Sequence, residues 1–139
     1  MGITYVEVEL VRGDDLALVR AGYINPEQVN QIRVLALVDS GASMLAIPRS
    51  LSQRLQLAKL DEVNTELANG EVMQADVVGP IEVRFQNRKT IVNAVVVEAD
   101  TDVLLGAIPM QSMDVMIDPK REQLIVNPDS PDRAYMLLK

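Results

Sequence analysis

The alternation of apolar and polar residues predicts a chain built mainly from β-strands. Residues 3–11 alternate at period two over most of their length, which is typical of a strand with one buried face. Residues 32–38 are nearly continuously apolar, as expected for a strand that is buried on both faces. The other segments with a strand-like pattern are residues 16–19, 65–68, 71–77, 81–85, 91–97, 115–117 and 123–126. The pattern as a whole predicts an all-β fold.

Turn-forming residues separate these strands. Residues 13–15 (Gly-Asp-Asp) are predicted to turn the chain after the first strand, residues 22–30 to form a loop, and residues 79–80 (Gly-Pro) to end another strand. Asn69-Gly70 joins two strand-like runs, which is the strongest local signal for a β-hairpin with a type I′ turn. We therefore expect a projecting hairpin around this pair.

Two short helices are expected among the strands. Pro48 precedes a segment in which Leu51 and Leu55 recur at helical spacing with polar residues between them. A second short helix is predicted to start near Pro109.

The length of the chain fits one compact core. We predict that its 139 residues form a single domain with a core over about residues 3–126 and a loosely held tail over residues 127–139. Within this tail, residues 134–138 are apolar enough for one more strand or a partner contact.

Composition and charge exclude several classes of function. The chain has no Cys and no His, which removes thiolate nucleophiles, disulfides, thiolate metal sites and every triad that needs an imidazole. A net charge of −7 disfavours nucleic acid or an anionic membrane surface as a partner. No apolar run is long enough to cross a membrane and no leader pattern is visible, so we expect a cytoplasmic protein.

A carboxylate stands at the end of the most apolar predicted strand. Asp39 follows residues 32–38 directly, and partial removal from water is costly for its charge unless something pairs with it or shares its proton. The backbone N–H groups of Ser40 and Gly41 can hold the carboxylate, and Gly41 lets a second chain or a substrate approach closely. Because all three residues are turn formers, the motif alone also fits an ordinary turn.

The residues around Asp39 resemble the active-site signature of the retropepsin-like aspartic proteases, the retroviral type of clan AA, and in particular its single-domain bacterial members. That signature is Leu37-Val38-Asp39-Ser40-Gly41-Ala42-Ser43. The remaining features of the family follow in order: Ile47-Pro48 before a helix, Ala68-Asn69-Gly70-Glu71 as a flap tip, Leu104-Leu105-Gly106 as a second signature, and residues 116–120 as the usual ending.

The resemblance implies a closed all-β acid-protease barrel with one or two short helices. It also implies a homodimer, in which each chain contributes one Asp39 to a shared active site that cleaves a peptide or protein substrate. The sequence contains a single Asp-Ser/Thr-Gly motif, so a second copy must supply the second carboxylate. Two such carboxylates would share one proton and activate a water molecule, with no metal, cofactor or covalent intermediate.

The resemblance assigns supporting roles next to Asp39. Ser40 would form a hydrogen bond to the matching loop of the partner chain, although a local turn hydroxyl is the alternative, and Gly41 would contact the substrate backbone. Ala42 stands where pepsin-like relatives carry a hydroxyl donor. Without that donor, the ionised form of the Asp39 carboxylate is stabilised less. We therefore predict activity at mildly acidic to neutral pH.

Two further groups of residues have expected roles. Asn69, Gly70 and Glu71 would close over a bound peptide as a lid, the alternative being an ordinary exposed hairpin. Leu104, Leu105 and Gly106 would pack behind Asp39. The residues considered for substrate pockets, with core packing as the alternative, are Met44, Leu45, Ile81 and Ile108.

Other functions remain open on the sequence alone. The main one is a dimeric β-barrel that binds peptides without cleaving them, because a fold does not fix a function. Another is a metal site with oxygen ligands at Asp14-Asp15 or at residues 100–102. Neither segment has the spacing of a calcium loop, so solvated loop charges are the preferred interpretation.

Overall fold

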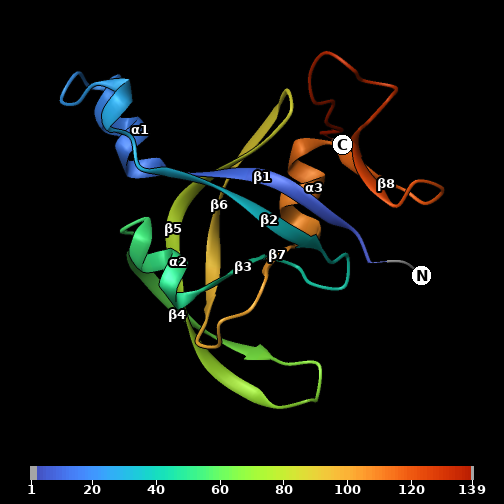
Figure 1. The fold of residues 1–139 in the computed structure, drawn as a ribbon, viewed down its shortest axis with the longest axis horizontal. Helices are drawn as coiled ribbons and strands as arrows, with labels where there is room; N and C mark the ends of the chain where they lie inside the picture. Colours follow the sequence, from blue (N-terminus) through green and yellow to red (C-terminus); the bar gives the residue numbers. More distant parts are fainter. Residues whose placement is uncertain (1–2, 139) are drawn as a thin grey trace.

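A closed ring of six β-strands forms the body of the protein (Figure 1). The computed structural model describes residues 3–138. Strand β1 (Tyr5–Arg12) pairs with β2 (Gln31–Val38) on one side and β5 (Val72–Phe85) on the other, which closes the ring. The order around the ring is β1-β2-β7-β3-β6-β5. Its other members are β3 (Leu45–Pro48), β6 (Arg88–Val97) and β7 (Val103–Leu105). The predicted closed all-β barrel is confirmed. Residues 1, 2 and 139 of the chain predicted to form a single domain lie outside the described residues.

Two hairpins extend from the ring. Strand β4 (Ala58–Glu66) pairs with the first half of β5 and forms the projecting hairpin that is green in Figure 1. Strands β8 (Val115–Asp118) and β9 (Gln123–Val126) form a separate two-stranded sheet. The sequence predicts both hairpins. The strand considered for residues 134–138 does not form in the part of the tail that the structure describes.

The Gly79-Pro80 pair does not end a strand as predicted. Strand β5 continues through it, and the register of its pairing with β6 shifts between Val78 and Ile81. A bulge of this kind leaves two residues out of the regular ladder and bends the strand. The same strand can therefore serve both the hairpin and the barrel.

Within residues 3–138, three short α-helices and one 3-10 helix occupy the connections between strands. Helices α2 (Arg49–Arg54) and α3 (Ala107–Met113) lie where helices are predicted, while α1 (Gly13–Arg20) and the 3-10 helix η1 (Pro26–Gln28) occupy the connection from β1 to β2. No helix within residues 3–138 is long and apolar enough to cross a membrane.

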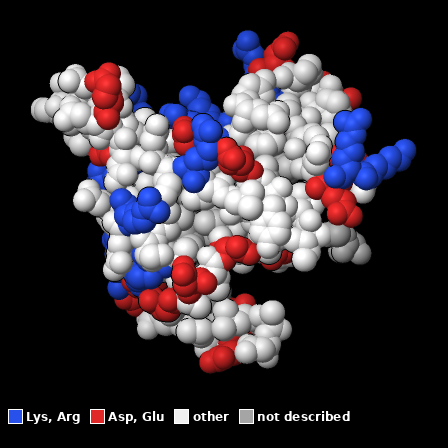
Figure 2. All heavy atoms as spheres, in the orientation of Figure 1, with Lys and Arg blue, Asp and Glu red and all other residues white. Residues whose placement is uncertain are grey.

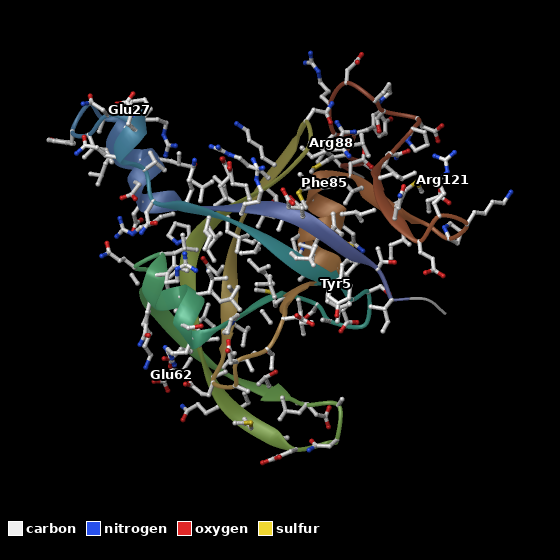
Figure 3. The ribbon with its side chains drawn as sticks, viewed as in Figure 1. Tyr5, Glu27, Glu62, Phe85, Arg88 and Arg121 are labelled. Atoms are coloured by element: carbon white, nitrogen blue, oxygen red, sulfur yellow. The ribbon has the colours of Figure 1, made fainter. Side chains whose placement is uncertain are left out.

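The strand predicted for residues 16–19 is wrong, because these residues belong to α1. Asp14 and Asp15 lie in the first turn of this helix and Arg20 in the last, where their charges interact favourably with the helix dipole. Asp15 is buried, and its carboxylate accepts hydrogen bonds from Arg12 Nη1 and Asn30 N at 2.6 and 2.9 Å. The placement of these charges therefore favours a helix over the strand that the apolar residues 16–19 predicted. Residues 13–30, which contain α1 and η1, form an arm that projects from one end of the barrel, with Glu27 near its tip (Figure 3).

Strand β2 is buried on one face of the single chain and not on both as predicted. Leu35 is 60% exposed and Arg33 is also exposed, whereas Ala36 is fully buried. In a barrel each strand turns alternate side chains inward. The inward side chains of all ring strands form one apolar core, whose fully buried members include Leu10, Leu45, Ile47, Ile81, Val83 and Leu105.

Candidate active site

Asp39 lies in the turn that directly follows β2, and its own loop orients the carboxylate. The Gly41 N–H donates a hydrogen bond to Asp39 Oδ1 at 3.0 Å. The Ala42 N–H donates to the Asp39 carbonyl at 3.1 Å, which closes the turn. Asp39 is half-buried, while Ser40 is exposed and its hydroxyl makes no hydrogen bond within the described residues.

The second signature segment fixes this loop from behind. Asp39 N donates to the Leu105 carbonyl at 3.0 Å, Ala107 N to the Ala42 carbonyl at 2.8 Å, and Ile108 N to the Ser43 carbonyl at 2.9 Å. Gly106 packs so tightly that an added Cβ would lie 2.3 Å from the carbonyl oxygen of Met44. The backbone of residues 105–108 thus sets the position of the Asp39 loop.

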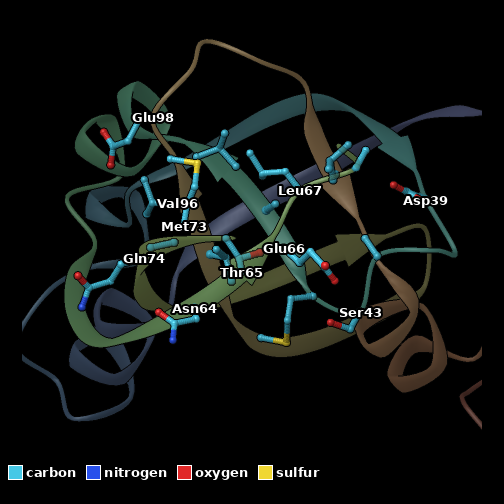
Figure 4. Close-up of a pocket in the computed structure, with 18 of the residues that line it drawn as sticks. Asp39, Ser43, Asn64, Thr65, Glu66, Leu67, Met73, Gln74, Val96 and Glu98 are labelled. Atoms are coloured by element: carbon cyan, nitrogen blue, oxygen red, sulfur yellow. The ribbon is translucent and has the colours of Figure 1, made fainter. Parts of the chain in front are cut away.

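A cavity of about 630 Å³ opens in front of Asp39 (Figure 4). Its base consists of Asp39, residues 41–44 and Ala46, and its cover consists of residues 64–68 and 73–75 of the β4–β5 hairpin. Residues 95–97 of β6, Glu98 directly after it, and Leu104 of β7 form the remaining wall. Figure 4 places Asp39 at one end of this cavity and Glu98 near the other. An extended peptide could lie along this length.

The tip of the hairpin differs from the predicted type I′ turn. Gly70 N donates to the Leu67 carbonyl at 2.9 Å and Leu67 N to the Glu71 carbonyl at 2.8 Å, with Gly70 at φ +85°. This is a three-residue loop in which a type I turn is followed by a left-handed glycine. Asn69 keeps a negative φ, and its side-chain oxygen instead accepts the Glu71 N–H at 2.9 Å.

The structure separates the residues considered for substrate binding. Met44 lines the cavity, whereas Leu45 and Ile81 are 0% exposed in the core. Leu104, predicted only to pack behind Asp39, also lines the cavity. Ile108 is 48% exposed outside the cavity. The flap-tip residues Asn69, Gly70 and Glu71 lie beyond the lining of the chain's own cavity.

Sequence analysis missed part of the wall and cover. Thr65, Met73 and Glu98 line the cavity but belong to no motif. Their place depends on the parallel pairing of β3 with β6 and on the pairing of Thr65 with Met73 in the hairpin. Only the pairing of Thr65 with Met73 can be predicted from the local sequence, since it follows from the hairpin around Asn69-Gly70.

Charged side chains gather at the Glu98 end of the cavity. Arg49 Nη2 lies 2.9 Å from Asp76 Oδ2 and 2.5 Å from Glu98 Oε1. Hydrogen bonds from Arg49 are the largest cause that lowers the pKa of both carboxyl groups below their ordinary values. Figure 2 shows acidic side chains along the rim of the hollow between the hairpin and the barrel.

The residues considered for metal binding have other partners. Asp15 pairs with Arg12 at 2.6 Å, and Asp102 accepts a hydrogen bond from the Tyr5 hydroxyl at 3.1 Å. Across residues 3–138 no group of three or more acidic side chains is arranged to hold a metal ion.

Comparison with known proteins identifies the family. The sequence profile of the aspartyl protease family matches residues 26–107, which is more than half of the chain and includes both signature segments. The chain belongs to the aspartyl protease family. No curated protein matches it in sequence.

Solved structures agree with this aspartyl protease assignment at the level of the fold. EIAV protease, determined as an inhibitor complex, superimposes with a TM-score of 0.55 at 13% identity over 79% of this chain and 86% of that one. The retroviral protease-like domain of Ddi1 from Leishmania major gives a TM-score of 0.54 at 18% identity over 90% of each chain. The chain has the retropepsin-like fold.

Proposed function

We propose that the chain is an aspartic endopeptidase that is active as a homodimer. The observation that carries this proposal is the oriented, half-buried Asp39 carboxylate at the end of a cavity that a β-hairpin covers. A scaffold without catalytic activity has no need for a charged group at that position.

The chemistry requires two Asp39 carboxylates, one from each copy. Two such groups close together cannot both ionise cheaply, so they share one proton. The ionised carboxylate accepts a proton from a bound water molecule as the water attacks the scissile carbonyl carbon. The protonated carboxyl donates its proton to the carbonyl oxygen, which gives a tetrahedral diol. The carboxyl that took the proton from water then protonates the leaving nitrogen, the other carboxylate takes a proton from one diol hydroxyl, and the C–N bond breaks, which restores the shared proton.

Exposed apolar residues near the Asp39 loop support the homodimer. Ile108, whose N–H bonds to the Ser43 carbonyl, is 48% exposed, and Ile3, next to Thr4 that bonds to Val38, is 70% exposed. The N-terminus and β8 lie on the same side of the molecule in Figure 1. A partner copy on this side would cover these side chains and bring a second Asp39 to the first.

The dimer also accounts for the positions of the hairpin tip and of Ser40. Asn69, Gly70 and Glu71 lie beyond the lining of the chain's own cavity, so in the dimer they would cover a peptide near the two-fold axis. Their backbone groups would pair with the extended substrate as an added strand does. The exposed Ser40 hydroxyl would bond to the partner's loop.

The test compares wild type with Asp39→Asn on a library of unstructured peptides at pH 4 to 8, with molecular mass measured in the same solutions. We expect a dimer and cleavage by wild type at mildly acidic to neutral pH. In Asp39→Asn we expect the cleavage rate to fall by at least about a hundredfold, because general acid–base catalysis contributes ~10²–10⁴ in rate. Asp14→Asn makes the same chemical change on the distant arm and should cleave like wild type.

Two outcomes would overturn the proposal. Equal cleavage by wild type and Asp39→Asn would assign the activity to a contaminant. Peptide binding without cleavage by dimeric wild type would favour the peptide-binding module instead.

A further inference from the structure

Arg49 connects the hairpin that covers the cavity to the cavity wall. It is the first residue of α2, and its guanidinium contacts Asp76 on β5 and Glu98 after β6. Asp76 also lies 3.3 Å from Lys59 Nζ on β4, so both strands of the hairpin are tied to the same cluster. One side chain therefore joins three elements.

The contacts lie where the hairpin leaves the barrel. Asp76 pairs with Glu62 across the hairpin and directly follows Ala75, which lines the cavity. Glu98 lines the cavity itself, at the end far from Asp39 in Figure 4. The distance between hairpin base and wall is thus set at a point remote from the reacting atoms.

The cluster is built to hold one geometry. The side chains of Arg49 and Asp76 are 33% and 24% exposed, so both are partly shielded from water. A guanidinium presents its donors in a rigid planar fork, which fixes two carboxylates relative to each other better than an ammonium group does. The lowered pKa values of Asp76 and Glu98 keep both carboxylates charged at mildly acidic pH.

The rest of the hairpin has little else to hold it. Strand β4 pairs with β5 alone among the described strands, and its residues are exposed except for a half-buried Thr65. A two-stranded ribbon of this kind is flexible when its base is free. The orientation of the ribbon over the cavity therefore depends on its base.

We propose that Arg49 is a positioning residue that holds the β4–β5 hairpin at a set height over the cavity through Asp76 and Glu98, and thereby sets the affinity for a peptide substrate. This inference rests on the proposed function, in which the hairpin closes over the substrate. The alternative is that the ion pairs contribute to folding stability alone.

Steady-state kinetics on the full-length dimer separates these possibilities. In Arg49→Gln we expect KM for a cleaved peptide to rise about fivefold to tenfold, a size typical of coupled contacts, while kcat changes less than about twofold. Arg49→Lys should recover part of the affinity, because an ammonium group can still pair with one carboxylate. Arg33→Gln, which removes an exposed ion pair with Glu7 on the outer face of β2, is the matched control.

Hydrogen exchange provides a readout that does not need catalysis. Amide exchange of residues 62–76 should be faster in Arg49→Gln and in Asp76→Asn than in wild type. The effects of the two changes should be less than additive in the double variant, since both release the Arg49–Asp76 contact and only Asp76→Asn also releases Lys59.

The outcomes distinguish this inference from the proposed function. Unchanged KM together with unchanged exchange in Arg49→Gln overturns the inference, as does a loss of kcat at constant KM. If wild type cleaves no peptide, the proposed function fails. Amide exchange then tests the role of Arg49 by itself. Faster exchange in Arg49→Gln shows that Arg49 holds the hairpin, and unchanged exchange shows that it does not.

Discussion

Gly106 is the residue with the least room for change near Asp39. Its φ of −86° suits any residue, so the requirement for glycine comes from space and not from backbone conformation. We predict that Gly106→Ala lowers the free energy of unfolding by about 3 kcal/mol, because the added Cβ would collide with the carbonyl oxygens of Ala42 and Met44. Denaturant titration with circular dichroism measures the effect.

Gly22 supplies the complementary control for Gly106. It has a φ of +83° and open space around its Cα, so Gly22→Ala tests conformational strain without collision. We expect a cost of about 1 kcal/mol. An equal or smaller cost in Gly106→Ala would show that the Asp39 loop can move away from α3.

Asp114 anchors the C-terminal tail. It accepts hydrogen bonds from Ser130 Oγ at 2.6 Å, Asn127 Nδ2 at 3.0 Å and Tyr135 N at 3.0 Å, and these bonds, led by that from Ser130, lower its pKa to about 2. A pKa below the unfolded value of about 3.9 means that ionised Asp114 stabilises the fold above that pH. The contribution is lost as the pH falls from about 4 towards 2.

We therefore predict that Asp114→Asn lowers stability at neutral pH and that its difference from wild type narrows between pH 4 and pH 2. Denaturant midpoints at several pH values measure this difference. If the difference in stability between wild type and Asp114→Asn stays constant or widens at acidic pH, the charge of the Asp114 carboxylate is not what holds the tail.

At the residue scale, sequence motifs identify what lies close along the chain. Asp39 and Gly106 are recognisable because each sits in a short signature with a physical reason for its neighbours. The anchoring role of Asp114 is not recognisable, since its partners come from a tail without a pattern. The contacts of Arg49 with Asp76 and Glu98 likewise join positions that only the folded barrel brings together.

The arm between β1 and β2 is an addition to the barrel. Arg12 N donates to the Asn30 carbonyl at 2.9 Å, so the two strands are already joined where the arm begins. We predict that replacing residues 13–29 by Asn-Gly leaves the barrel folded, with a change in unfolding free energy within about 2 kcal/mol, because the shorter connection offsets the lost contacts.

Circular dichroism, molecular mass and peptide cleavage test the shortened chain. Aggregation or loss of the folded signal would show that α1 and its buried Asp15 are required for the barrel to form.

At the element scale, periodicity predicts most strands and both helices that begin near prolines. It fails for α1, because Leu16 to Val19 form an apolar run too short to distinguish a strand from a helix. It also gives the wrong turn at Asn69-Gly70, where the Asn69 side chain stabilises a longer loop. Side-chain interactions favour the observed conformation in both cases: charges at the two ends of α1, and a hydrogen bond from Glu71 N–H to the Asn69 side chain at the turn.

For the whole molecule, net charge opposes the proposed homodimer. Each copy carries a net charge of −7, so two copies repel each other at long range. We predict that the dimer dissociation constant falls at least about threefold when NaCl rises from about 20 mM to about 300 mM, because salt screens this repulsion. Sedimentation equilibrium measures the constant, and a weaker dimer at high salt would indicate an interface held by charge pairs.

The closed barrel as a whole is predictable only through the resemblance to a family. Closure depends on β1 pairing with β5 in the register that places Glu9 opposite Arg84, whose side chains lie 3.1 Å apart. No local pattern specifies a pairing between positions so far apart along the chain. The dimer is a prediction of the same kind, since it follows from the single Asp39.

The hydrogen bonds between the Asp39 loop and residues 105–108 have a consequence for folding during synthesis on the ribosome. The loop lacks its three supporting hydrogen bonds until Leu105, Ala107 and Ile108 have emerged and folded. A nascent chain that has exposed Asp39 alone therefore has no ordered site, and domains generally form as complete units. The proposed catalytic site can therefore form only after residues 105–108 have left the ribosome and folded, and a second folded copy must then join it.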